Sequence, residues 1–312
     1  MLKFHYRIND KDITMKWKKG RKSSNVDDRR KSSGRSGRGF RMPSMQTLFF
    51  IFPLIKPLLK SKLGLLVVGA GALAWMSGFN PLSLMTGGGG ASSTSISPEH
   101  QQADDQRAAF ISTVLADTED VWSRIFNQVG YTYKEPKMVL YRGNTRSACG
   151  GADAAMGPFY CPADETVYID LGFFDELKYK FKASGDFAQA YILAHEVGHH
   201  IQNLQGTLEK STRMKQRMGK SDANAMQVKI ELQADCYAGI WAHHAHKMKN
   251  ILEEGDIDEA LNAAKVIGDD TLQKKAQGYV VPDSFTHGSS KQRMSWFLRG
   301  LKNGDIGSCN TF

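Results

Sequence analysis

The stretch Tyr191–Gln202 reads YILAHEVGHHIQ and contains the pattern H-E-x-x-H at His195, Glu196 and His199. On an α-helix, residues four apart lie on one face, so the two histidines can present ring nitrogens to one ion. Glu196 lies about 100° round the helix from His195 and can reach a water on that ion. This spacing predicts a zinc site with two histidine ligands and a glutamate as general base.

The apolar residues around the motif predict that its helix is largely buried. Gly198 lies inside the motif, where glycine costs about 1 kcal/mol of helix propensity relative to alanine. Such a glycine usually has a packing reason, and we expect another helix to approach closely there. Three fixed residues also occur by chance, so the prediction of a metal site needs further ligands.

A third ligand is predicted in the segment 221–247, which has a helical pattern with Ser221 as a plausible N-cap. Glu231 and Asp235 lie four residues apart within it. A catalytic zinc has three protein ligands and one open position, so Glu231 can complete a site for one zinc per chain. Asp235 can accept a hydrogen bond from the far nitrogen of a ligand histidine. The alternative is a solvated acidic face, which the apolar neighbours of these acids disfavour.

Several segments together resemble one family, the bacterial neutral zinc metallopeptidases, which are membrane-anchored zincins. These segments are HEVGHH, ELQADCYAG, THGSSKQRMSWF, the Cys149–Leu177 stretch and the N-terminal KWKKGRKSSNVDDRR. The resemblance covers nearly the whole chain from about Met15. It implies a zincin fold with His195, His199 and Glu231 as ligands and Glu196 as base, and it says little about the substrate. The family-like start predicts that residues 1–14 are an upstream extension.

The predicted fold class is α+β and mainly helical: a zincin-like domain at 97–312 with a small β-sheet, preceded by one transmembrane helix. Helices are expected at 98–129, 256–267 and 289–302, strands at 137–141 and 166–171, and a loop at 206–220. The resemblance to zincins implies that the substrate binds as an added strand along a sheet edge. Residues 166–171 are the candidate edge strand, and an internal strand is the alternative.

The basic charge of the chain belongs to its N-terminal region. Residues 1–62 carry 17 Lys and Arg against four Asp and Glu, whereas the remaining residues carry 24 against 28. The polar, Ser- and Gly-rich residues 1–46 predict a disordered tail, followed by an interfacial segment at 47–62. No nucleic-acid partner is expected, because a folded reader and interleaved aromatic residues are missing from this region.

Residues 63–85 begin with the uncharged run LGLLVVGAGALAWMSGF and are predicted to be a single-pass anchor in the inner membrane. The preceding positive charges place the N-terminus in the cytoplasm and the domain in the periplasm. Residues 86–96 read as a flexible linker. A signal peptide cleaved near Ala72–Ala74 and a buried core helix are the alternatives.

All four cysteines, Cys149, Cys161, Cys236 and Cys309, fall in the predicted periplasmic domain. An even number in an oxidising compartment favours disulfides, and four cysteines allow three pairings. We hypothesise the pairs Cys149–Cys161 and Cys236–Cys309. A structural zinc site made by all four is the competing interpretation, although no C-x-x-C cluster is present.

His287 and Arg293 are candidate donors to an oxyanion. The segment Thr286-His287 with Arg293 resembles a T-H-P…R segment of the membrane-integrated heat-shock zinc peptidases, with Gly288 in place of proline. The alternatives are a helix-entry role for His287 and a buried salt bridge for Arg293, for example to Asp235.

The function predicted from these observations is a membrane-anchored, zinc-dependent endopeptidase that acts on a protein or peptide substrate. Glu196 would take a proton from the zinc-bound water and pass it to the leaving amine. Two alternatives remain open. One is a non-catalytic, zinc-stabilised envelope adaptor that binds extended peptides, and the other is a metallohydrolase of non-peptide amides.

Overall fold

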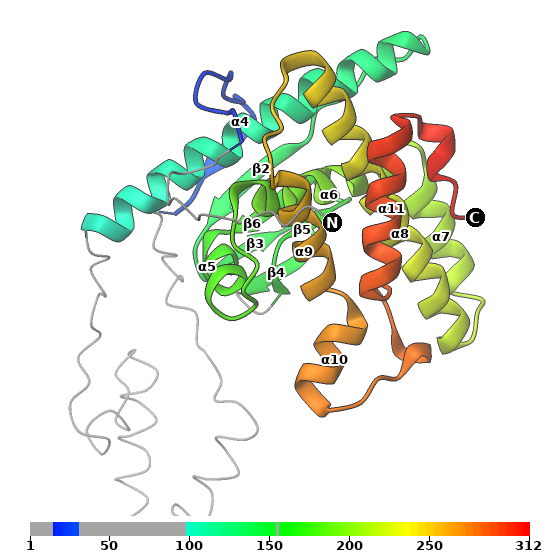
Figure 1. Ribbon diagram of the computed structural model, residues 1–312. Helices are drawn as coiled ribbons and strands as arrows, with labels where there is room; N and C mark the ends of the chain where they lie inside the picture. The colour runs from blue at the N-terminus through cyan, green and yellow to red at the C-terminus, as the bar shows by residue number, and fades with distance from the viewer. Residues whose placement is uncertain (1–14, 31–97, 154–155) are drawn as a thin grey trace, which may run out of the picture. The chain divides into compact units, whose positions relative to one another are not determined.

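A small mixed β-sheet forms one side of the domain. The computed structural model describes residues 15–30, 98–153 and 156–312 (Figure 1). Its strands are β1 (Val26–Asp28), β2 (Lys137–Tyr141), β5 (Phe159–Cys161) and β6 (Thr166–Asp170), in the order β1-β2-β6-β5. Strands β1, β2 and β6 are parallel, and β5 is antiparallel to β6. A separate antiparallel pair is formed by β3 (Asn144–Ser147) and β4 (Gly150–Asp153).

The two faces of the sheet meet different partners, because side chains alternate along a strand. Met138 and Leu140 of β2 and Ile169 of β6 belong to the main core. This core also includes apolar residues of the long helix α4 (Pro98–Gln128) and of helix α6 (Asp186–Leu204). Val139 and Tyr168 point to the opposite face, where they form a smaller cluster with Ala152 of β4.

The remaining helices follow α6 in the sequence, apart from α5 (Leu171–Tyr179), which begins directly after β6. They are α7 (Thr207–Lys215), α8 (Lys220–Lys249), α9 (Asp256–Val266), α10 (Asp269–Gln277) and α11 (Ser290–Asn303), with short 3-10 turns η3 (Pro282–Ser284) and η4 (Ile306–Cys309). In Figure 1, α8 and α11 lie side by side. Helix α11 begins with a capping box in which Ser289 and Gln292 bond to each other's main-chain N–H groups.

Close helix packing explains the glycine inside the metal-binding motif. A Cβ atom at Gly198 of α6 would lie 2.9 Å from the carbonyl oxygen of Ala234 and 3.0 Å from its Cα, both main-chain atoms of α8. The prediction that another helix approaches at Gly198 is confirmed. The absent side chain lets the two ligand-bearing helices come close enough to share one ion.

The predicted mainly helical α+β class is confirmed, and three local predictions are wrong. Strand β6 is internal, because β2 and β5 pair with its two sides, and the edges of the sheet are formed by β1 and β5. Most of the predicted loop 206–220 is helix α7, which begins at Thr207 after Gly206 adopts a left-handed conformation. The third error concerns the N-terminal tail.

Residues 15–30 are ordered, contrary to the prediction of a disordered region. Met15 is only 1% exposed, and the main-chain N–H of Ser23 donates to the carbonyl oxygen of Ser112 at 3.0 Å. Arg21 forms an ion pair with the buried Glu119 at 2.9 Å. The segment is stable because its polar groups find partners on α4 and its main chain completes the sheet through β1.

The predicted anchor at 63–85 and linker at 86–96 lie outside the described residues. Among the residues that are described, none of the helices combines the length and apolar character that crossing a bilayer requires. Strand β1 precedes this region in the sequence and β2 follows it, yet the two strands are hydrogen-bonded neighbours. Residues 26–28 and 137–141 therefore lie on the same side of any membrane.

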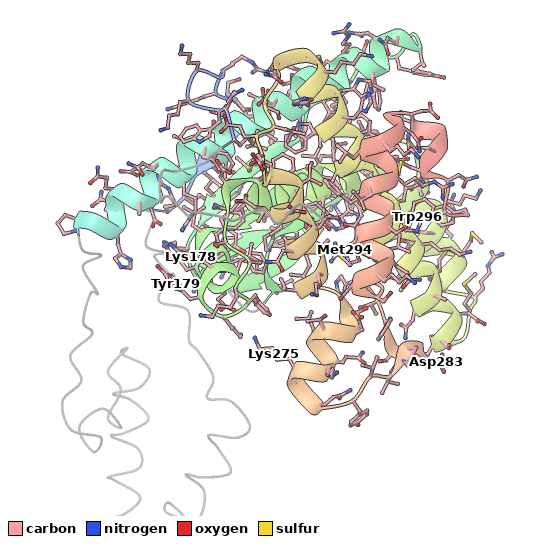
Figure 2. All side chains as sticks on the ribbon, in the orientation of Figure 1. Lys178, Tyr179, Lys275, Asp283, Met294 and Trp296 are labelled. Atoms are coloured by element: carbon pink, nitrogen blue, oxygen red, sulfur yellow. A yellow bond between two sulfur atoms is a disulfide. The ribbon has the colours of Figure 1, made fainter. Side chains whose placement is uncertain are left out.

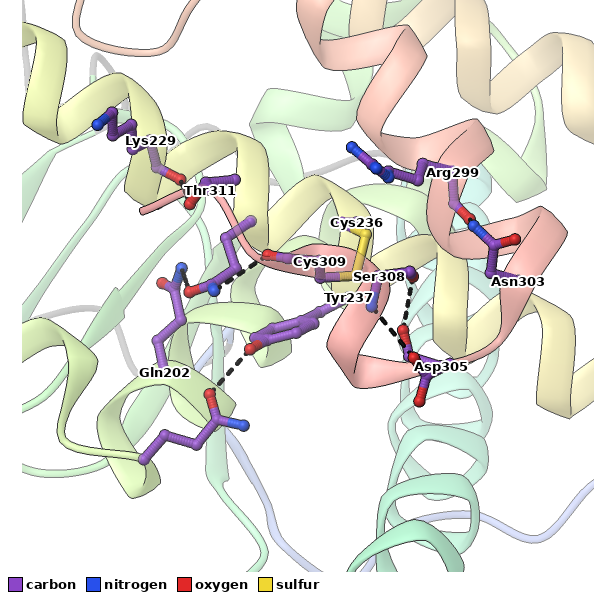
Figure 3. Close-up of a disulfide and its surroundings, with 12 residues drawn as sticks. Gln202, Lys229, Cys236, Tyr237, Arg299, Asn303, Asp305, Ser308, Cys309 and Thr311 are labelled. Carbon is purple, nitrogen blue, oxygen red and sulfur yellow. Dashed lines mark hydrogen bonds between the residues drawn. A yellow bond between two sulfur atoms is a disulfide. The ribbon is translucent and has the colours of Figure 1, made fainter.

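Both hypothesised disulfides are present, Cys149–Cys161 and Cys236–Cys309. The four-cysteine zinc site is therefore excluded for this structure. The second disulfide joins the middle of α8 to the C-terminal segment (Figure 3). Thr311 extends this attachment by donating a hydrogen bond to the carbonyl oxygen of Lys229 at 2.9 Å.

Candidate metal centre

Helices α6 and α8 bring the three predicted ligands together. One nitrogen or oxygen atom from each of His195, His199 and Glu231 lies within 4.8 Å of the other two. Oε2 of Glu231 is 3.2 Å from Nε2 of His195 and 3.5 Å from Nε2 of His199. Zinc–ligand bonds of about 2.1 Å in tetrahedral geometry place ligand atoms about 3.4 Å apart. The donor set and its spacing therefore fit a zinc ion.

His195 is held by a buried network behind the three ligands. Its Nδ1 lies 2.8 Å from Oδ1 of Asp235, and a carboxylate only accepts hydrogen bonds, so Nδ1 carries the proton and Nε2 keeps its lone pair for a metal. Asp235 also accepts hydrogen bonds from Tyr191 at 2.5 Å and from Nε and Nη2 of Arg293, both at 2.9 Å. Burial of this network fixes the orientation of the ring.

His199 is oriented by a second set of hydrogen bonds, formed by glutamine side chains. Its Nδ1 lies 2.8 Å from Oε1 of Gln202, which leaves Nε2 free for a metal. Gln202 donates from Nε2 to Oε1 of Gln233 at 3.0 Å, and Gln233 donates to the carbonyl oxygen of Cys309 at 3.1 Å. This relay connects His199 to the Cys236–Cys309 disulfide, and Figure 3 shows its disulfide end.

The two glutamates of the site differ in their surroundings. Glu231 accepts a hydrogen bond from Gln227 at 2.8 Å through Oε1, and its Oε2 faces both histidines. Glu196 is 7% exposed, lines the cavity and makes no hydrogen bond with another described residue. Its carboxylate is available to accept a proton from a water molecule.

An open cavity of about 960 Å³ lies over the ligands. Its walls come from segments far apart in the sequence: Gly157–Tyr160 around β5, Phe173 and Phe181 near α5, Leu208 of α7, Leu272 of α10 and His287. Figure 2 shows Lys275 projecting from α10. Its Nζ donates to the carbonyl oxygen of Lys180 at 2.9 Å and lies 4.7 Å from the ring centroid of Phe181, so α10 and the segment after α5 meet at the cavity.

The electrostatics of the site favour a bound cation. Burial alone would raise the pKa of Asp235, but Arg293 and His195 outweigh it and lower that pKa to about 2. Burial also opposes ionisation of Glu231, yet the two histidines hold its pKa well below the ordinary value. Both carboxylates are therefore ionised. Burial lowers the pKa of His195, whereas Asp235 and Glu231 raise it to about 10. Without a metal the ring is therefore an imidazolium, and a metal bound here takes the place of the proton on Nε2.

The two candidate oxyanion donors, His287 and Arg293, both lie near the cavity but in different environments. Nδ1 of His287 lies 3.2 Å from Oδ1 of Asp269, and the side chain is 52% exposed. The hydrogen bond to Asp269 raises the pKa of His287, which favours the imidazolium form. Arg293 is 3% exposed and forms the buried ion pair with Asp235 that the alternative interpretation predicts. Its Nη1 makes no hydrogen bond with a described residue.

Several residues around the ligands were missed by the sequence interpretation. Gln202 lies three residues after His199, so helical spacing alone could have indicated it. Tyr191 could likewise have been found one turn before His195. Asp269 carries no such signal, because the chain must fold before it meets His287.

Two further histidines among the described residues, His200 and His243, have structural partners. His200 follows the motif, and its ring contacts Tyr160 at 2.9 Å and the carbonyl oxygen of Lys134 at 2.6 Å. Nδ1 of His243 lies 2.8 Å from the carbonyl oxygen of Leu301. These contacts account for both side chains without a metal.

Known proteins are similar to this chain in sequence, although no solved structure matches it. A protein named "Uncharacterized protein YpfJ" from Escherichia coli (strain K12) is 48% identical over 304 residues, covering 96% of this chain and 99% of the relative. "Uncharacterized protein Rv2575" from Mycobacterium tuberculosis (strain H37Rv) is 43% identical over 190 residues, 58% of this chain and 63% of the relative. A family model described as "Putative neutral zinc metallopeptidase" matches residues 15–312, and the chain belongs to that family.

Proposed function

We propose that this protein is a zinc-dependent endopeptidase. The observation that supports the proposal is the arrangement of His195, His199 and Glu231 around one point, with the unpaired carboxylate of Glu196 beside them in an open cavity. A purely structural zinc site is closed by four protein ligands, whereas three ligands leave a position for water. The size and openness of the cavity suit a polypeptide better than a small molecule.

Each residue around the metal site has its own role in peptide hydrolysis. A zinc ion bound here would lower the pKa of a water molecule and polarise a carbonyl group. Glu196 accepts a proton from the attacking water and then donates it to the leaving amine. His287, held as an imidazolium by Asp269, donates to the carbonyl oxygen as negative charge develops on it. Asp235 and Gln202 keep the two ligand rings in their tautomers.

The substrate binds in an extended form along β5. This strand is at the edge of the sheet, and the residues Gly157–Tyr160 line the cavity. Main-chain pairing with an edge strand gives affinity with little sequence selectivity, and side-chain pockets then select among peptides. The apolar wall formed by Phe159, Phe173 and Phe181 favours a bulky apolar side chain next to the cleaved bond.

Two other functions could use the same cavity. A zinc-stabilised adaptor would bind extended peptides, but it would have no need of the buried, unpaired Glu196. A hydrolase of non-peptide amides would need Glu196 equally, and only substrate profiling separates it from a peptidase.

The proposal is tested with the purified chain and its Glu196→Gln variant, prepared under oxidising conditions. Residues 15–30 are retained, because removing them would delete β1 and uncover the core around Met15. We expect one zinc per chain in both proteins and casein cleavage only in the first. Equal cleavage by both proteins would refute the role of Glu196, and zinc binding without cleavage in either would favour the adaptor.

The two disulfides favour an oxidising compartment, so we place the domain in the periplasm. Residues 15–30 are then periplasmic too, because β1 pairs with β2, and this replaces the predicted cytoplasmic position of that segment. The chain between residues 30 and 98 would cross the bilayer an even number of times or not at all. Membrane contact through residues 63–85 stays a prediction.

Single cysteines at exposed positions test this placement. Ser24→Cys lies in the N-terminal segment and Asn303→Cys at the end of α11, and the native cysteines are paired in disulfides. We expect a membrane-impermeant thiol reagent to label both positions from the periplasmic side. Labelling of the two positions from opposite sides would contradict the proposal.

A further inference from the structure

Three carboxylates gather where helices α6 and α9 begin, away from the metal ligands. Asp186 is the first residue of α6, and Asp256 and Glu259 lie in the first turn of α9, with oxygens within 4.8 Å of one another. Glu259 accepts the main-chain N–H of Phe187 at 3.0 Å. Asp256 accepts the main-chain N–H of Glu253 at 2.9 Å. These two acids therefore have partners at helix starts, where negative charge is favourable.

Asp186 has no such partner. Both of its carboxylate oxygens are buried, and neither has a well-formed hydrogen bond with a described residue. Among the described residues, no Lys or Arg side chain forms an ion pair with any of the three acids. Burial and the neighbouring Asp186 raise the pKa of Glu259 to about 7, and burial raises that of Asp256 to about 6. Such a cluster is relieved either by protonation or by a cation placed beside it.

The main-chain nitrogen of Met15 reaches the cluster. It lies within hydrogen-bonding reach of Asp186. Burial raises the pKa of that carboxyl, and the main-chain nitrogens of Met15, Phe187 and Asp186 oppose this effect. The position of Met15 is well fixed: its side chain is in the main core, and the next residue, Lys16, donates its main-chain N–H to the carbonyl oxygen of Ile251 at 3.0 Å. The ring of Trp17 packs edge-on against Phe110.

Whether the nitrogen of Met15 is a neutral amide or a charged α-ammonium group decides whether the negative charge of the three carboxylates is compensated. An amide at Met15 offers one proton and no charge. An α-ammonium group at the same place offers three protons and a positive charge, with an ordinary pKa of about 8. The match to the family model also begins at residue 15.

We propose that Asp186, Asp256 and Glu259 form a binding site for the α-ammonium group of Met15, which is the N-terminus of the mature chain. The ammonium group supplies the missing cation, and Asp186 is its main acceptor. Through this contact the N-terminus fixes the start of α6, the helix that carries His195 and His199.

A divalent cation is the competing occupant. Three carboxylates also suit calcium, which binds oxygen ligands, although it usually takes six to eight of them. The two occupants respond differently to the chain end, because only the ammonium group depends on where the chain begins.

The experiment compares two proteins: residues 1–312, and a chain that begins at Met15 after cleavage of a fusion partner. Asp186→Asn is introduced into each, and unfolding by urea is measured. We expect the substitution to raise the unfolding constant at least about tenfold more in the chain that begins at Met15. One alanine added before Met15 displaces the ammonium group by about 3.8 Å and should abolish the difference.

Two further measurements complete the test. Asp222→Asn, at an exposed acid in the first turn of α8, should have the same small effect in both proteins. Glu259→Gln gives the same comparison if Asp186→Asn does not fold. An equal cost of Asp186→Asn in the two proteins overturns the proposal. Stabilisation of residues 1–312 by calcium chloride, lost in Asp186→Asn, overturns it in favour of a cation site.

Discussion

Asp235 of α8 lies 2.8 Å from Nδ1 of His195 on α6 and, on its other side, forms a two-point ion pair with Arg293 of α11. One buried carboxylate thus joins three helices and holds a metal ligand in the required tautomer.

Replacing Asp235 by asparagine is expected to weaken zinc binding about 10- to 100-fold, because the ring of His195 loses its fixed acceptor. Competition with a chelator measures the affinity. The same substitution leaves the buried Arg293 unpaired, which costs about 3–5 kcal/mol of stability. Adding Arg293→Met should restore stability without restoring zinc affinity, and recovery of both would contradict the positioning role.

His287→Ala is expected to lower kcat by about 10²- to 10³-fold with unchanged zinc content, because a donor to the developing oxyanion is lost. Asp269→Asn should have a smaller effect, since the imidazole remains but its charge is less favoured. Steady-state kinetics with a defined peptide separates kcat from KM. A change in KM alone would show that His287 contributes only to substrate binding.

Loss of the Cys236–Cys309 disulfide is expected to act on both stability and metal binding. Because the disulfide closes a loop in the unfolded chain, its loss is expected to lower the free energy of unfolding by about 2–4 kcal/mol. Its loss also frees Cys309, the end of the hydrogen-bond relay that orients His199. The double Cys→Ser variant should therefore bind zinc about tenfold more weakly. The matched variant at Cys149 and Cys161 should lose stability and keep its zinc affinity; an equal loss of affinity in both would argue against the relay.

Gly198→Ala is expected to destabilise the protein although alanine favours helices. The added Cβ would meet main-chain atoms of Ala234, and overpacking of this kind costs about 1–3 kcal/mol, more than the propensity gain of about 1 kcal/mol. Urea unfolding measures the difference. Gly219→Ala, at an open position before α8, is the control and should be nearly neutral.

The raised pKa of Glu259, about 7, predicts a pH dependence in the chain that retains residues 1–14. The folded state binds this proton more tightly than the unfolded state, so Glu259 favours folding below the ordinary pKa of 4.5 and loses that contribution as pH rises to about 7. The facing charged groups are Asp186 of α6, Asp256 and Glu253 near the start of α9, and Lys16 of the N-terminal segment.

Urea unfolding of wild type and Glu259→Gln between pH 4 and pH 8 measures the contribution of Glu259. The stability of wild type relative to the variant should fall as the pH rises. A constant difference between the two proteins would show that folding leaves the pKa of Glu259 unchanged.

Helical spacing indicated most of the residues of the candidate site. His195, His199, Glu231 and Asp235 could be assigned from i, i+4 relationships on two helices, since such positions share a face wherever the helix lies. The same local rules predicted α4, α9, α11 and the strands β2 and β6. The glycine at position 198 also indicated that another helix packs closely against α6.

Strand order and long-range partners could not be read in this way. The pattern of residues 166–170 shows a buried strand, but its central position depends on neighbours at 137–141 and 159–161. The polar composition of residues 15–30 indicates disorder, yet these residues pair with groups on α4 and β2 that lie about a hundred residues away.

The i, i+4 spacing on two helices was enough to indicate the candidate metal ligands, because this spacing is a local property of the helical backbone. The groups that orient those candidates, the strand that borders the cavity and the packing of the N-terminal segment became clear only from the folded chain. These features depend on contacts between distant segments, and a contact is stable only when burial and hydrogen bonding at both partners outweigh the entropy lost in joining them.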